Sequence, residues 1–175
     1  IGTPAAKWGP WFRDESRPHG DLASVAGNFR HLVDPKRILD IYRYYSLFTT
    51  VNDRKVKIVC RYQQYHGGEA IVRRVLKGYP KKGLIWHFQG SGKSWLMVFA
   101  AQKLRNMAAL ENPTVVIVDD RVDLEDQITG DFMRAEIPNL AKAGSREELE
   151  TFFREDQRMI LITTIFKFGE VQGEL

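Results

Sequence analysis

The chain has 175 residues, of which 43% are hydrophobic and 27% charged, and its formal net charge is +4. This composition is typical of a globular protein and argues against a disordered chain. No apolar run reaches the roughly 18 residues that span a bilayer, so we expect no membrane segment. The charge is uneven: residues 1–110 carry 19 Lys and Arg against 7 Asp and Glu, whereas residues 111–175 carry 7 against 15. A basic half suits a polyanionic partner, but it also suits a plain solvated surface.

The sequence has one cysteine, Cys60, and this number bears on the redox environment of the protein. One cysteine cannot form an internal disulfide, which predicts a protein of the reducing cytoplasm. Cys60 ends the largely apolar run 56–60, so we expect a buried core thiol. The chain starts at Ile1 without a methionine or a signal-peptide pattern, and we therefore expect it to be a fragment of a longer polypeptide.

The first third of the chain is expected to be irregular and then helical. Residues 1–21 are rich in Pro, Gly and Trp, which predicts irregular chain or a short strand followed by a loop. Asp34 as an N-cap and Pro35 in the first turn predict a helix start. The apolar face expected for this helix consists of Ile38, Leu39, Ile41, Tyr42 and Tyr45. Residues 55–60 resemble a short strand, and a helix is expected from about Glu69 to near Gly78.

From residue 83 onward, the pattern predicts strands alternating with helices. Strands are expected at 83–88, 114–118 and 159–165, and helices at 95–110, 123–133 and 145–155. The last of these helices begins with a predicted capping box of Ser145 and Glu148. The 95–110 helix is apolar on nearly every side and should be buried, and the 114–118 strand should be covered on both faces. This alternation predicts an α/β fold with a parallel sheet.

Between the first strand and its helix lies a loop, Gln89-Gly90-Ser91-Gly92-Lys93-Ser94, that resembles a phosphate-binding loop. Its two glycines allow backbone angles that other residues avoid, and a helix N-terminus follows, which favours anions. The lysine can reach β- and γ-phosphates and the final serine can bind Mg²⁺. In the usual spacing the first glycine would occupy position 87, which is His87 here. The alternative is a Gly-Ser turn followed by a surface lysine.

The acidic residue that would hold Mg²⁺ and order water is harder to find. Asp119 and Asp120 follow the 114–118 strand and could serve, but we favour their capping the next helix. The 159–165 strand ends in threonines. We expect the acidic Walker B residues beyond Leu175.

These motifs together resemble the R subunit, the restriction and motor subunit, of type I restriction enzymes, whose motor belongs to helicase superfamily two. Trp86 to Ser94 is similar to the family's loop segment, in which a histidine stands at position 87. The segment after the 114–118 strand is similar to the family's Asp-Arg-x-Asp-Leu-x-x-Gln and maps onto Asp120, Arg121, Asp123, Leu124 and Gln127. Residues 162–168 look like its Thr-Thr-Ile-Gln-Lys-Phe, with Phe166 in place of Gln. Upstream, 60–75 resembles its Arg-Tyr-x-Gln segment, and 1–12 resembles the tail of its nuclease domain.

The resemblance implies an incomplete first RecA-like motor lobe at 56–175, a helical linker at 31–55 and the end of a nuclease domain with its linker at 1–30. It implies ATP and Mg²⁺ as cofactors, held by residues 89–94 with Lys93 and Ser94 as catalytic groups. Gln64, or Gln63 as the near alternative, would read adenine. Implied DNA contacts are Arg121, Thr163 and Thr164. The implied partners are double-stranded DNA and the methylation and specificity subunits.

Several of these assignments have plainer alternatives. The threonines are also ordinary strand residues, Arg121 is equally a partner for Asp123, and the two glutamines are also solvated residues. The cluster Arg73, Arg74, Lys77, Lys81 and Lys82 could steer DNA or be a solvated face. Trp86 and Trp95 are expected to pack, and His19, His31 and His66 show no metal spacing.

The resemblance predicts a motor that couples ATP hydrolysis to translocation along DNA and to cleavage. The nuclease residues are expected before Ile1, and the fragment alone should be inactive. One rival is another superfamily-two motor, such as a type III restriction or repair helicase. The other is a nucleotide-gated DNA-binding module without hydrolysis.

Overall fold

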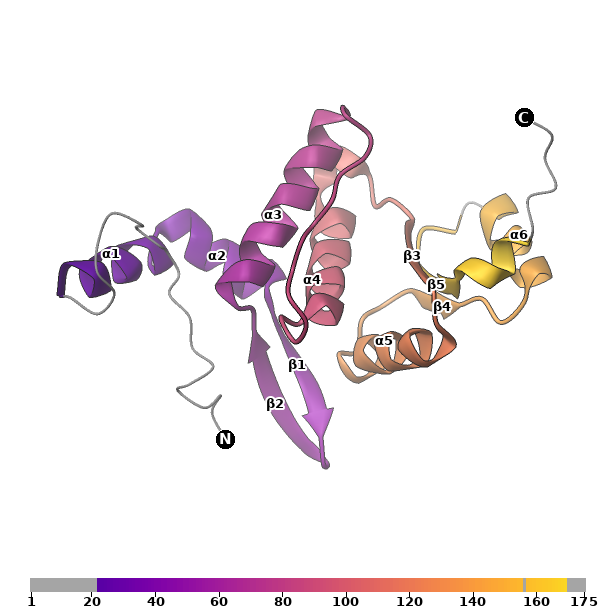
Figure 1. The fold of residues 1–175 in the computed structure, drawn as a ribbon, viewed down its shortest axis with the longest axis horizontal. Coiled ribbons are helices and arrows are strands. Elements are labelled where there is room, and N and C mark those ends of the chain that lie inside the picture. The colour runs from indigo at the N-terminus through magenta and orange to yellow at the C-terminus, as the bar shows by residue number, and fades with distance from the viewer. Residues whose placement is uncertain (1–21, 156, 170–175) are drawn as a thin grey trace.

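The computed structural model describes residues 22–155 and 157–169, which form helices around two separate small sheets (Figure 1). The expected nuclease-domain tail at 1–12 lies outside the described residues. In chain order the elements are α1 (Leu22–Leu32), α2 (Pro35–Tyr44), β1 (Ser46–Val51), β2 (Arg54–Val59), α3 (Tyr62–Lys77), α4 (Lys93–Asn106), η2 (Ala108–Leu110), β3 (Val115–Asp119), α5 (Val122–Arg134), β4 (Leu140–Lys142), α6 (Arg146–Arg154), β5 (Ile160–Thr164) and η3 (Ile165–Phe168). None of the helices in the described ranges has the length and apolar character needed to cross a membrane.

The larger sheet is parallel and has the order β3-β5-β4, which confirms the α/β prediction. Ile160 of β5 aligns with Val115 of β3 and with Leu140 of β4. The central strand β5 is buried along its whole length, as predicted. The edge strand β3 differs from the prediction, because Val116 and Val118 are 36% and 46% exposed. The face of β3 that carries Ile117 is covered, whereas the face that carries Val116 and Val118 is open to solvent in the described structure.

The strand expected at 83–88 is absent from the described fold. These residues form no ladder, and Figure 1 shows them as a loop that runs back along α3 and α4 towards the start of α4. Leu84 and Trp86 are 84% and 88% exposed, so the packing expected for Trp86 is also wrong. An apolar run becomes a strand only when another strand pairs with its N–H and C=O groups, and no described strand does so here. Trp95, by contrast, does pack against the core, with its ring 6.5 Å from that of Phe99.

The region expected to be a helical linker is helical only as far as Tyr44. It continues into the antiparallel β1–β2 hairpin, whose turn is made by Asn52 and Asp53, both with positive φ. The predicted strand at 55–60 is confirmed as β2, but its partner β1 was not expected. The hairpin spans residues 46–59, so the proposed division between 55 and 56 falls within a single supersecondary unit.

Helix α3 begins at Tyr62, seven residues before the predicted start at Glu69, and ends at Gly78 as predicted, with φ of 71°. Gly67 and Gly68 directly precede the predicted start, and glycine disfavours a helix interior. In the structure both glycines are buried within the helix, and they allow other elements to approach it closely. A Cβ on Gly68 would lie 2.7 Å from the Tyr45 hydroxyl, and one on Gly67 would lie 3.2 Å from Leu96.

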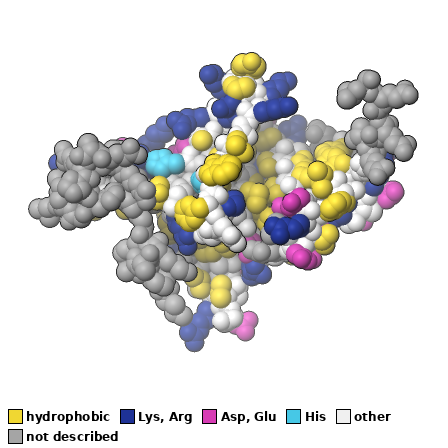
Figure 2. Space-filling view, viewed as in Figure 1, with side chains coloured by type: hydrophobic (Ala, Val, Ile, Leu, Met, Phe, Trp, Pro, Cys, Tyr) yellow, Lys and Arg dark blue, Asp and Glu magenta, His cyan; other side chains and the backbone are white. Residues whose placement is uncertain are grey.

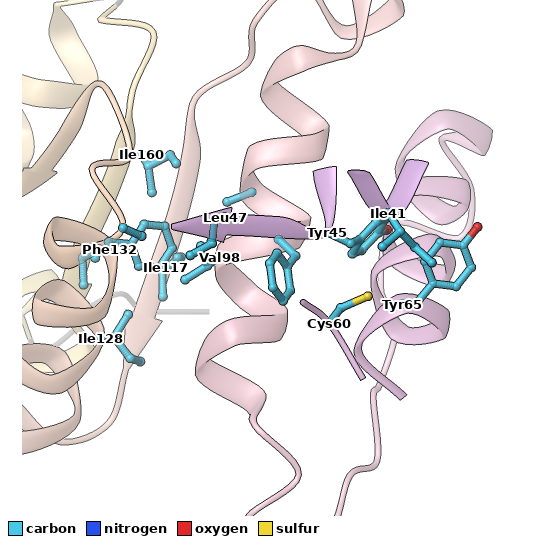
Figure 3. Packing of buried hydrophobic residues seen from close by; sticks show 14 residues of the cluster. Ile41, Tyr45, Leu47, Cys60, Tyr65, Val98, Ile117, Ile128, Phe132 and Ile160 are labelled. Carbon is cyan, nitrogen blue, oxygen red and sulfur yellow. The ribbon is translucent and has the colours of Figure 1, made fainter. Parts of the chain in front are cut away.

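The main core lies on both sides of α4, whose Val98 and Phe99 are fully buried, as the sequence predicted for this helix. Figure 3 shows Ile117 and Ile160 of the parallel sheet on one side of it and Tyr45 and Cys60 on the other. Cys60 is confirmed as a buried thiol, and burial raises its pKa to about 12. Helix α4 therefore joins the sheet to the helical N-terminal part.

Two predicted helix starts are confirmed. Asp34 Oδ1 accepts from Arg37 N at 3.0 Å, and Ser145 Oγ accepts from Glu148 N at 3.2 Å. The return bond of the capping box differs, because the Glu148 carboxylate accepts from Gly144 N instead. The face predicted for α2 is only partly buried: Ile41 and Tyr45 are in the core, whereas the remaining three members are exposed, namely Ile38, Leu39 and Tyr42.

Candidate nucleotide-binding site

The glycine-rich loop lies at the N-terminus of α4, where the sequence placed it. Gly92 is the N-cap and Gly90 lies two residues before it, with φ of 83° and 77°, a region that disfavours residues with a Cβ. A Cβ on Gly92 would also collide with the Gln64 side-chain amide. Both glycines are therefore required by the observed backbone, and the second is also required by its neighbour.

Gln64 holds the loop against α3. It is 4% exposed, its Oε1 accepts from Arg61 N at 2.7 Å, and its Nε2 donates to Gly92 O at 3.0 Å. The structure thus places the predicted adenine reader beside the loop, with both ends of its amide engaged by backbone. Gln63 is half-buried, and its Oε1 has no partner among the described residues. Reading of a base by Gln64 would use its second Nε2 hydrogen or would break the bond to Gly92.

Two cationic side chains donate to carbonyl groups in the loop and in the two residues before it. Lys93 Nζ donates to His87 O at 3.0 Å and to Phe88 O at 2.9 Å, and Arg61 Nη1 donates to Gly90 O at 3.3 Å. These hydrogen bonds lie in exposed surroundings. Phosphate oxygens are stronger acceptors for ammonium and guanidinium groups than neutral carbonyls are. A bound triphosphate could therefore take over these donors without breaking any buried bond.

The residues of the loop fit a nucleoside triphosphate. Ser91 is fully buried, and its Oγ has no partner in the described part of the chain. The first amides of α4 have no intrahelical acceptor, and no side chain caps them. Such an uncapped helix start favours an anion. Ser94 lies in the first turn and is half-buried, and a hydroxyl there can bind Mg²⁺ beside a phosphate. Gln89 is exposed at the loop entrance.

Asp119 and Asp120 do not cap the following helix, so that expectation is wrong. The N-cap of α5 is Arg121, and no side chain caps this helix. Asp119 ends β3 with its Oδ2 buried and unpaired among the described residues. Burial, followed by the charges of Asp120 and Glu125, raises the pKa of Asp119. A carboxylate at the end of a parallel strand is where an acidic metal-binding group would lie, so this alternative to a later Walker B stays open.

The predicted DNA contacts differ in accessibility. The Arg121 side chain is 71% exposed and lies 3.9 Å from Asp120, not beside Asp123 as the alternative expected. An exposed pair of this length holds a side chain weakly, so Arg121 can reach a phosphate. Thr163 and Thr164 are 0% and 1% exposed. Both lie on the central strand β5, which is buried along its whole length, so Arg121 is the most accessible of the three predicted DNA contacts.

A buried ionic cluster joins the two family segments that follow β3 and β5, and sequence reasoning missed it. The Glu125 carboxylate, 2% exposed, lies 2.7 Å from Lys167 Nζ and 3.2 Å from Lys142 Nζ. Lys142 also contacts Asp126 at 2.6 Å. Glu125 occupies a variable position of the first segment, so the motif gave no signal for it. The cluster fixes the start of α5 against η3.

A second buried cluster was also missed. Lys103 of α4 contacts Asp40 of α2 at 3.1 Å and Glu69 of α3, and the Tyr45 hydroxyl donates to Glu69 at 2.7 Å. Burial alone would lower the pKa of Lys103, but its hydrogen bonds to Glu69 and Asp40 leave that pKa raised. Lys103 is therefore held as an ammonium ion that links the N-terminal helices to α4, the helix that follows the glycine-rich loop.

A glycine-rich loop that opens a buried helix beside a parallel sheet with flanking helices defines a RecA-like nucleotide-binding lobe. The sequence model of the SWI2/SNF2 ATPase family matches residues 63–174, which include the loop and the whole parallel sheet. The chain therefore belongs to the SWI2/SNF2 ATPase family.

Relatives of this chain are endonuclease subunits. The type I restriction enzyme HindI endonuclease subunit of Haemophilus influenzae is 34% identical over 150 residues, which cover 79% of this chain and 14% of that protein. A Methanocaldococcus jannaschii protein, provisionally named the MjaVIIP type I restriction enzyme endonuclease subunit, is 39% identical over 135 residues, or 73% of this chain and 12% of that protein. The predicted resemblance to R subunits is confirmed. The chain spans only 12% to 14% of the length of these two relatives.

Proposed function

We propose that this chain is part of the ATP-driven DNA translocation motor of a type I restriction endonuclease R subunit. The observation that carries the proposal is the loop itself. Three features support a cradle for phosphate: Gly92 in the left-handed region, an uncapped start of a buried helix, and a Ser91 hydroxyl that has no partner among the described residues. The similarity to type I endonuclease subunits supports the choice of this motor among the family's members.

Each residue of the loop has a proposed part. The amides that follow Gly90 and Gly92 bind phosphate oxygens, Lys93 neutralises the β- and γ-phosphates, and Ser94 helps to hold Mg²⁺. ATP bound with Mg²⁺ supplies the γ-phosphoryl group that is transferred to water. Gln64, whose side-chain amide donates to Gly92 O, would position the loop and read the adenine edge.

Further parts of the proposal concern the whole protein. Its partners would be double-stranded DNA and the methylation and specificity subunits of a restriction complex. Arg121 is the exposed candidate for a DNA phosphate contact. Residues 56–175 would belong to the first motor lobe, after a linker at 31–55 and the end of a nuclease domain at 1–30.

The test is DNA-stimulated ATP hydrolysis by the full-length polypeptide carrying Lys93→Ala. We expect hydrolysis to fall to background, because the variant lacks the ammonium that balances the transferred phosphate. Lys55→Ala, an exposed lysine of β2, is the matched control and should hydrolyse ATP at the wild-type rate. Wild-type turnover in Lys93→Ala would refute the assignment.

A further inference from the structure

A strongly basic surface of the described chain lies away from the phosphate loop. It consists of Arg73, Arg74, Lys77, Lys81 and Lys82, which we call the basic end of α3. All five are exposed, and Figure 2 shows Lys and Arg side chains gathered at this end of the molecule. Between Glu69 and Glu111 the sequence contains no acidic residue at all. The surface therefore carries cations without acidic neighbours along the chain.

This surface is separate from the candidate nucleotide site. Gln64, which touches the phosphate loop, and Lys77 are thirteen residues apart on one helix. At 1.5 Å per residue, they lie about 20 Å apart along its axis. Between Arg73, Lys77 and the following Pro80 there is an open groove of about 280 Å³. A group bound in this groove could not touch the loop.

The shape of the basic end is held by its own contacts. Arg74 Nη1 donates to Lys82 O at 2.9 Å and lies 3.5 Å from Pro80 O, which folds the chain after the helix back onto it. Gly78, in the left-handed conformation, makes this turn possible. Lys81 and Lys82 are thereby kept close to Lys77, so the charges are gathered before any partner arrives.

Helix stability alone does not explain these charges. Cations in the last turn interact favourably with the helix dipole, which accounts for Arg74 and Lys77. Lys81 and Lys82 lie beyond the helix, where the effect has decayed. The nearest acid in sequence, Glu69, is already engaged by Lys103 and by the Tyr45 hydroxyl. The five cations of the basic end of α3 therefore repel one another, and an anionic partner would relieve this repulsion.

We propose that the basic end of α3 binds the phosphate backbone of double-stranded DNA, as a contact distinct from the nucleotide site. The choice of DNA as the polyanion rests on the proposed function. An acidic protein is less suitable, because lysine is depleted in protein interfaces, whose centres are apolar and aromatic. Phosphate contacts carry no sequence information, which suits a motor that must move along any sequence.

The experiment measures the affinity of the full-length polypeptide for a duplex of about three helical turns at several salt concentrations, without nucleotide. The variant carries Arg73→Gln, Lys77→Gln and Lys81→Gln, and it leaves Arg74 in place to hold the turn. The control removes the same charge from the hairpin strand β2 by Arg54→Gln, Lys55→Gln and Lys57→Gln, which are all exposed.

We expect the slope of log affinity against log salt to become shallower by roughly 2 to 3 in the variant, about 0.9 for each phosphate that the protein no longer neutralises. Its affinity near 0.1 M salt should fall at least about ten-fold, while the control keeps the wild-type slope. A wild-type slope in the variant, equal reductions in both triple variants, or a wild-type protein that does not bind the duplex would each overturn the proposal. ATP hydrolysis without DNA is measured in parallel and reports on the proposed function alone, because none of the six residues lies in the phosphate loop.

Discussion

The glycine pair inside α3 leads to a sharp prediction about packing. Replacing Gly68 by alanine would place a methyl group 2.7 Å from the Tyr45 hydroxyl and ring. Carbon atoms in contact normally lie about 3.5–4.0 Å apart, so the overlap is close to 1 Å. Tyr45 cannot move aside easily. It is fully buried, its hydroxyl is bonded to Glu69, and its ring lies 5.0 Å from that of Tyr65.

The expected magnitude follows from two opposing terms. Overpacking of a well-filled core costs roughly 1–3 kcal/mol, and the displaced Tyr45–Glu69 hydrogen bond adds about 1 kcal/mol. Alanine gains about 1 kcal/mol over glycine through its helix propensity. The net effect of Gly68→Ala is a destabilisation of about 2 kcal/mol.

The assay is chemical denaturation followed by circular dichroism, with Gly67→Ala as the matched control. A Cβ at Gly67 would meet mainly the ends of the Leu96 side chain at 3.2 Å, and these can rotate away. Its effect should therefore stay within about 1 kcal/mol of the wild type in either direction. Equal free energies of unfolding for Gly68→Ala and Gly67→Ala would show that close packing of α3 against Tyr45 is not the reason for glycine at position 68.

Other contacts give further expectations. Lys103→Met should lower the free energy of unfolding by roughly 3 kcal/mol, because it removes the cation between the partly buried carboxylates of Asp40 and Glu69. The double variant Lys103→Met with Glu69→Gln should recover part of this stability in a denaturation experiment, and no recovery would argue against charge as the cause. Asp34→Ala should lower the free energy of unfolding by about 1 kcal/mol, because it removes the acceptor that caps α2. The control in the same denaturation experiment is Asp34→Asn, which keeps an acceptor. Burial raises the pKa of Cys60 from 9.0 to about 12, so the unfolded chain releases this proton at a lower pH than the folded chain does. The free energy of unfolding should therefore fall as the pH rises between those values, and it should fall less steeply in Cys60→Ala. Parallel curves of unfolding free energy against pH for the wild type and Cys60→Ala would contradict the burial of the thiol.

Much of the candidate site could be predicted from the sequence. The glycines, the lysine and the helix after them were placed correctly, because the backbone angles of a tight loop and the start of a helix depend on residues a few positions apart. The same holds for the Asp34 cap and the Gly78 end of α3. The buried strand β5 was also recognised, from its unbroken apolar run.

The errors have a common origin in contacts between distant residues. Residues 83–88 have the composition of a strand, but a strand needs a partner, and composition does not supply one. Gly67 and Gly68 resemble a loop until Tyr45 and Leu96 are seen packed against them.

The sequence by itself therefore determined the glycine-rich loop, the helices and strands after it apart from the short strand β4, and the family. Tertiary structure alone decided which strand edges stay open, that Gln64 braces the loop, and which of the charged residues lie in buried clusters at Lys103 and Glu125. The physical reason is range. Backbone angles and caps are fixed by near neighbours, whereas burial and ion pairing depend on which distant segments the fold brings together.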